Sequence, residues 1–198
     1  MELPTKHRLT ACLIGFCLMW TMGCSDLPEN INRLSSSAVR DGHDTTLGRT
    51  FDRQLVNHLD KSGVILLGRG LDAFVGRALL ASLAERSIDV QYYMFHQDTV
   101  GKLLIDQMIK AADRGVRVRM LIDDIYGSNA DDVWTALDAH PQIKVRLFNP
   151  FVRDASKNLQ WVTRFKDVNY RMHSKSFTVD NQVCIVGGRN IGDEYFDA

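Results

Sequence analysis

From residue 64 onward, apolar positions alternate between short continuous runs and stripes that recur every three to four residues. The runs predict strands and the stripes predict amphipathic helices. In chain order we predict strand 64–67, helix 71–85, strand 88–95, helix 100–114, strand 116–122, a helix at about 131–139 and strand 143–148. This alternation predicts an α/β fold in which a mixed β-sheet is flanked by helices.

The N-terminus has the pattern of a secretory signal, which we assign to residues 1–23. Lys6 and Arg8 precede the apolar run 9–20, which is short for a membrane span. Cys24 follows a glycine, as in the processing site of bacterial lipoproteins, where the cysteine becomes the lipidated first residue. We therefore expect a membrane-anchored, exported lipoprotein of a bacterial cell envelope. Simple cleavage and a retained anchor are the alternatives to lipidation.

A polar stretch separates this signal from the folded domain. Residues 24–46 contain few apolar positions and read as a flexible tether. Leucine or phenylalanine then recurs every four residues from Leu47 to Leu59, which predicts a helix, and Gly63 is typical of a helix end. We place the domain at residues 47–198.

Composition narrows the classes of function. With 24 basic and 24 acidic residues the formal charge is zero, which does not favour a nucleic-acid partner, and 45% hydrophobic content supports a packed core. Of the four cysteines only Cys184 lies beyond the signal region. The chain therefore predicts no internal disulfide, and no Cys/His spacing indicates a metal site.

Reactive groups concentrate in the spacing His173-x-Lys175-x4-Asp180. In a strand, His173 and Lys175 share one face, about 7 Å apart at their Cβ atoms, so that a phosphate group fits between them. Asp180 has the opposite parity and opens a hairpin turn with Asn181, which places it to brace rather than to attack. A Gly187-Gly188-x-Asn190 bend follows.

This composition would produce such a spacing by chance roughly 0.02 times. The alternative interpretation is a half-buried hairpin whose histidine and lysine merely face solvent.

The motif and bend resemble those of the phospholipase D superfamily. The runs at 188–196, 71–74 and 89–93 look most like bacterial cardiolipin synthases, and the likeness begins at about residue 62. The resemblance implies a phosphohistidine intermediate on His173, formed without a metal or other cofactor. Lys175, Asn190 and the amides near Gly187 and Gly188 would stabilise the phosphoryl oxygens. The implied partners are a phospholipid substrate and the membrane surface.

Members of this superfamily combine two such motifs, in one chain or by dimerisation, and this sequence has no second His-x-Lys. The chain stops 18 residues after Asp180. We therefore expect one lobe, incomplete at its C-terminal end, which needs a second lobe from a longer chain or a homodimer. Gly188 also stands where many relatives have serine or threonine, so one hydroxyl contact to phosphate is in doubt.

Three functions remain open at this point. The first is a phosphatidyltransferase that passes the phosphatidyl group to a lipid alcohol. The second is a phospholipase or nuclease that hydrolyses phosphodiesters as a dimer. The third is a noncatalytic lipoprotein that keeps the fold as a binding module.

Residues 149–168 lack a clear period, which predicts a long loop. Between Lys144 and Lys175 there are 8 basic and 2 acidic residues with interleaved aromatics. This composition suits a phosphate-bearing substrate and a bilayer interface, or a solvated loop, and less well a nucleic acid. The Asp123-Asp124 pair at a strand end could hold a metal, but a turn or helix cap is the simpler interpretation. Asp98 or Thr99 is expected to cap the following helix.

Overall fold

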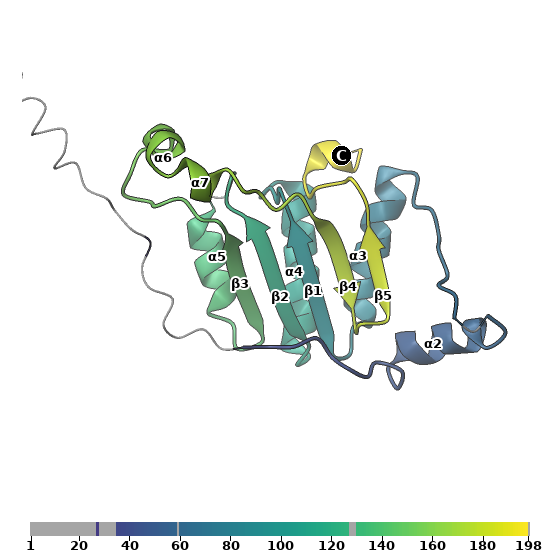
Figure 1. The fold of residues 1–198 in the computed structure, drawn as a ribbon. Helices are drawn as coiled ribbons and strands as arrows, with labels where there is room; N and C mark the ends of the chain where they lie inside the picture. The colour runs from purple at the N-terminus through teal and green to yellow at the C-terminus, as the bar shows by residue number, and fades with distance from the viewer. Residues whose placement is uncertain (1–26, 28–34, 59, 127–129, 198) are drawn as a thin grey trace, which may run out of the picture.

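A five-stranded sheet forms the centre of the fold in the computed structural model, which describes residues 27, 35–58, 60–126 and 130–197 (Figure 1). The strand order is β3-β2-β1-β4-β5. The strands are β1 Ser87–Tyr92, β2 Arg117–Asp123, β3 Ile143–Phe148, β4 Lys175–Val179 and β5 Val183–Val186. β1, β2 and β3 are parallel, whereas β4 runs antiparallel to β1 and to β5. The predicted mixed α/β sheet is confirmed.

Helices cover one face of this sheet. Figure 1 shows α3 Gly70–Leu83, α4 Thr99–Asp113 and α5 Asp131–Asp138 side by side behind the strands. The strands bury alternate side chains: Ile88, Val90 and Tyr92 of β1 are at most 2% exposed, and the residues between them are not buried. This period of two decides on which face of the sheet each side chain near a strand end lies.

Local sequence signals fix the ends of two elements. Asp98, one of the two residues expected to cap α4, is its N-cap: its carboxylate accepts a hydrogen bond from the Gly101 amide at 3.1 Å. Asp180 and Asn181 both have positive φ, at 52° and 54°, a conformation that aspartate and asparagine tolerate better than other non-glycine residues. They form the turn between β4 and β5, so the predicted hairpin is confirmed.

Three sequence predictions were wrong in detail. Residues 64–67 form no strand: Val64, Ile65 and Leu66 are at least 80% exposed, and no strand of the described residues pairs with them. The first described helix, α2 Thr46–Leu55, ends well before the Gly63 signal. The predicted loop 149–168 contains two short helices, α6 Lys157–Thr163 and α7 Phe165–Val168.

Most of the predictions for the N-terminus concern residues outside the described part of the chain. The signal 1–23 and the lipidation site Cys24 lie outside the described residues. From residue 35 the predicted tether lies against the domain: Arg86 donates to the Asp41 carbonyl at 2.8 Å and Asn181 donates to the Val39 carbonyl at 3.0 Å. Its role as a tether stays a prediction. No helix among the described residues is long and apolar enough to cross a bilayer.

Candidate active site

The residues of the His-x-Lys spacing lie at one edge of the sheet. The carboxyl ends of β1, β2 and β3 meet the amino end of β4 at this edge, because β4 is antiparallel to β1. Tyr92 of β1 is the partner of Lys175 at the start of β4. The residues just beyond these positions, Tyr93 and His173, therefore lie close together.

His173 and Lys175 share one aromatic surface, the ring of Tyr93. The imidazole and phenol rings have centroids 4.8 Å apart at an interplanar angle of 63°. The Lys175 ammonium lies over the same ring, 5.2 Å from its centroid. His173 itself is exposed and precedes the first residue of β4. The two predicted reactive residues are thus brought together, with the imidazole open to solvent.

Sequence reasoning gave no role to Tyr93. The residue belongs to a run quoted only for its family likeness, and its contacts depend on the register between β1 and β4. Burial raises the pKa of Tyr93 above its usual value, so its phenol stays neutral near pH 7. It presents a neutral ring face to the ammonium.

Lys175 is a buried cation that lacks an acidic partner. Its side chain belongs to a residue only 7% exposed, and its Nζ donates to the His173 carbonyl at 3.0 Å. No carboxylate of the described residues forms an ion pair with it. Burial lowers the pKa of Lys175, because desolvation disfavours the charged form. The cation–π contact with Tyr93 offsets part of that penalty. An anionic oxygen that entered here would supply the missing counter-charge.

Asp180 occupies the opposite end of β4, about 17 Å along the strand from Lys175. Its carboxylate is fully buried and accepts hydrogen bonds from the amides of Glu85, Arg86 and Ser87 at 3.0, 2.7 and 2.9 Å. These bonds hold the β4–β5 turn against the start of β1. The structure therefore separates Asp180 from the other two residues of the motif.

The glycine-rich bend returns to the edge that carries His173. Asn190 is buried: its Oδ1 accepts from the Met94 amide at 3.3 Å and its Nδ2 donates to the Tyr195 hydroxyl at 3.0 Å. Gly187 and Gly188 are exposed, with open space where a Cβ would stand. Phosphate binding by these three residues stays a prediction.

The Asp123-Asp124 pair is not arranged to hold a metal. Both carboxylates are buried and already accept hydrogen bonds from an arginine each and from backbone amides. A different group of possible ligand atoms, on His96, Asp98 and Glu194, lies within 4.8 Å. Asp98, however, uses one oxygen to cap α4 and the other to accept from the Asp193 amide at 2.7 Å. We assign no metal to either group.

The mixed α/β sheet and the His-x-Lys spacing at the start of β4 are those of the phospholipase D superfamily, a class of phosphodiesterases and phosphatidyltransferases. Within that class, residues 79–198 match the family model described as "Cardiolipin synthase, PLD-like domain", and the chain belongs to this family.

Two relatives that are themselves cardiolipin synthases by name agree with this assignment. The chain is 50% identical to cardiolipin synthase C of Escherichia coli K12 over 141 residues, which are 71% of this chain and 30% of that protein. It is 32% identical to a cardiolipin synthase of Oceanobacillus iheyensis over 112 residues, 57% of this chain and 22% of the relative. Among solved structures, NucT from Helicobacter pylori superimposes with a TM-score of 0.49 at 20% identity, covering 67% of this chain and 76% of that one. The chain thus spans less than a third of either cardiolipin synthase.

Proposed function

We propose that this chain supplies one half of the active site of a phosphatidyltransferase of the cardiolipin-synthase type. The observation that carries the proposal is the buried Lys175 ammonium, which contacts the same tyrosine ring as the exposed His173 imidazole and has no carboxylate partner among the described residues. A nucleophile next to a cation that lacks a counter-ion suits attack on a phosphodiester, whose nonbridging oxygens carry the negative charge.

The reaction proceeds in two displacements at phosphorus. A neutral ring nitrogen of His173 attacks the phosphodiester and forms a phosphorus–nitrogen bond, while the bond to the first alcohol breaks and the departing oxygen takes up a proton. A hydroxyl of a second lipid then attacks phosphorus and gives up its proton, the phosphorus–nitrogen bond breaks, and His173 is restored. Lys175 stabilises the phosphoryl oxygens in both steps.

The proton for the departing alcohol comes from a second lobe in this proposal. Three other histidines of the described residues are paired with carboxylates rather than placed beside a lysine: His43 with Asp52, His96 with Glu194 and His140 with Asp113. A second His-x-Lys lobe, in a longer chain or in a second copy of this one, would bring an imidazole of the right kind.

A phospholipid substrate is supported by the segment that leads to His173. Along α6, α7 and the residues after them, four large apolar or aromatic side chains are 50–79% exposed: Leu159, Val162, Phe165 and Tyr170. Such side chains beside basic residues suit the interface of a bilayer. Hydrolysis is the second candidate, since water could replace the lipid hydroxyl. The basic excess of residues 144–175 would also admit a nucleic-acid phosphodiester.

The test incubates the purified full chain, over a range of protein concentrations, with phosphatidylglycerol vesicles and in parallel with DNA. Formation of cardiolipin, with a rate that rises more steeply than protein concentration, is the expected result for two lobes that assemble. Phosphatidic acid or cleaved DNA as the main product would favour the hydrolase. No product from either substrate at any concentration would contradict catalysis by this chain with a second copy of itself.

A further inference from the structure

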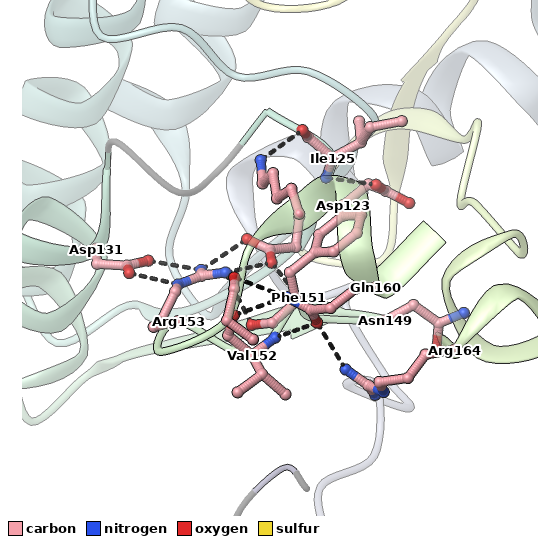
Figure 2. Close-up of polar contacts among 12 residues, drawn as sticks. Asp123, Ile125, Asp131, Asn149, Phe151, Val152, Arg153, Gln160 and Arg164 are labelled. Carbon is pink, nitrogen blue, oxygen red and sulfur yellow. Dashed lines mark hydrogen bonds and ion pairs between the residues drawn. The ribbon is translucent and has the colours of Figure 1, made fainter. Parts of the chain in front are cut away.

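Two adjacent buried carboxylates at the end of β2 hold the two ends of one long segment, which we call the 149–172 excursion. Asp124 holds its beginning: it accepts from the Phe151 amide at 2.7 Å and from both terminal nitrogens of Arg153, at 2.5 and 2.7 Å. Arg153 also bonds Asp131 at the start of α5. Figure 2 shows the side chains of Arg153 and Asp131 facing each other, joined by these bonds.

Asp123 holds the end of the same segment. Its Oδ1 accepts from Arg171 Nη1 and from the Ile125 amide, both at 2.9 Å, and its Oδ2 accepts from the Met172 amide at 2.7 Å. Arg171 in turn donates to the carbonyls of Asn149 and Val168 at 2.8 and 2.7 Å. This carboxylate therefore ties the excursion to β2 at the residue directly before His173.

His173 consequently stands between two fixed points. On one side the Met172 amide is bound by Asp123, and the Met172 side chain is buried. On the other side Lys175 is in register with Tyr92 of β1. Consecutive Cα atoms are 3.8 Å apart, so anchors one and two residues away leave the His173 backbone little freedom. Because the imidazole is exposed, packing in the protein core does not fix its position.

We propose that Asp123 is a positioning residue for His173: through Arg171 and the Met172 amide it keeps the imidazole against Tyr93. The proposal rests on the proposed function for its catalytic consequence, but the position of the ring can be measured without any activity. Asp123 does not touch the substrate. Its effect on the reaction comes from geometry, to which displacement reactions are sensitive at the level of about 1 Å.

Asp124 provides a matched control. It is the neighbouring residue, it is equally buried, and it also pairs with an arginine, but it holds the beginning of the excursion rather than its end. We compare Asp123→Asn with Asp124→Asn in the full chain. Both variants lose a buried ion pair, and both are expected to melt at a lower temperature.

The first measurement is the nuclear Overhauser contact between the rings of His173 and Tyr93 in selectively labelled protein. It should weaken in Asp123→Asn and persist in Asp124→Asn. The second measurement is steady-state transfer with phosphatidylglycerol. Asp123→Asn should lower kcat about 100-fold with KM nearly unchanged, whereas Asp124→Asn should keep kcat within about threefold.

An unchanged ring contact in Asp123→Asn, or an equal loss in both variants, would overturn the proposal whether or not the chain is active. If the ring contacts follow the expected pattern but the wild type shows no turnover, the result counts against the proposed function alone.

If Asp123→Asn does not fold, Arg171→Lys replaces it: it keeps the positive charge but loses the forked bonds to Asn149 and Val168. It should weaken the same ring contact and lower kcat about tenfold. A wild-type contact in that variant would again overturn the proposal.

Discussion

Each end of β4 carries a buried charged side chain, but the two charges have opposite environments. At one end the Lys175 ammonium is buried, pairs with no carboxylate in the part of the chain that the structure describes, and shares the Tyr93 ring with an exposed imidazole. At the other end the Asp180 carboxylate is buried and accepts three backbone hydrogen bonds. The first arrangement costs stability and leaves a site for an anion, whereas the second stabilises the fold and leaves nothing to react. One short motif thus contains one end proposed for chemistry and one end that stabilises the fold.

The largest expected effect follows from removing the proposed nucleophile. His173→Ala should abolish transfer, by about 10⁴-fold or more, because no covalent intermediate can form. The free energy of unfolding should change by less than about 0.5 kcal/mol, since the side chain is exposed. Urea denaturation and a transfer assay measure the two quantities. Ser174→Ala, at the exposed neighbouring position, is the control and should keep activity.

Lys175→Met should also lower kcat, by about 10²- to 10³-fold, because the phosphoryl oxygens lose their cation. Unlike most core substitutions it should not destabilise the protein, and a gain of about 1 kcal/mol is expected from removing an unpaired buried charge. A loss of several kcal/mol in urea denaturation would mean that the ammonium has a structural role. Lys175→Arg keeps a charge and tests whether charge alone is sufficient.

The lowered pKa of Lys175 gives this comparison a pH dependence. Its folded value lies below its unfolded value, so the charged form opposes folding at neutral pH. That penalty is relieved as the pH rises through the folded value toward the ordinary value of 10.5. Wild-type stability should therefore rise relative to that of Lys175→Met on the alkaline side. Parallel unfolding curves at pH 7 and pH 10 measure the difference, and a constant difference would contradict the assignment.

Asp180→Asn should have the reverse signature. The substitution places amide hydrogens against three backbone donors, and a loss of about 3 kcal/mol of unfolding free energy is expected. The contact between His173 and Tyr93 should survive in the folded molecules, because it lies at the other end of the strand. If Asp180→Asn removed that contact while stability held, the division of the motif into two ends would be wrong.

The smallest expected effect is that of Asp193, three residues after Asn190, on stability in acid. Hydrogen bonds from the Val100 and Thr99 amides lower the pKa of Asp193 below 3.8. This stabilisation is complete above the unfolded value and is lost as the pH falls through the folded one. Asp193→Asn should therefore flatten the loss of stability between about pH 5 and pH 2. Acid titration followed by circular dichroism would show it, and parallel curves for the variant and the wild type would exclude it.

The features that could be predicted from the sequence are those determined by residues close together in the chain. The strands and helices between residues 87 and 148 have long, regular apolar periods, and the Asp180-Asn181 turn is determined by two adjacent residues. Strand parity predicted that His173 and Lys175 share one face, but it did not predict that Lys175, the first residue of β4, is buried while His173 is exposed.

What sequence reasoning missed depends on distant partners. Tyr93 meets His173 only through the register of β1 with β4, and Asp123 meets Arg171 across 48 residues. The failed strand at 64–67 has the same cause, because an apolar run forms a strand only where another strand pairs with it. Helices α6 and α7, of 7 and 4 residues, are too short to show a period.

The most direct test of the central claim is mass spectrometry of the protein after mixing with phosphatidylglycerol and a rapid quench in cold denaturant at neutral to mildly alkaline pH, because a phosphorus–nitrogen bond is labile in acid. The proposed function predicts a phosphatidyl adduct on His173, present in the wild type and absent in His173→Ala. An adduct on another residue, or product formation without an adduct at any quench time, would contradict the assignment of His173 as the nucleophile.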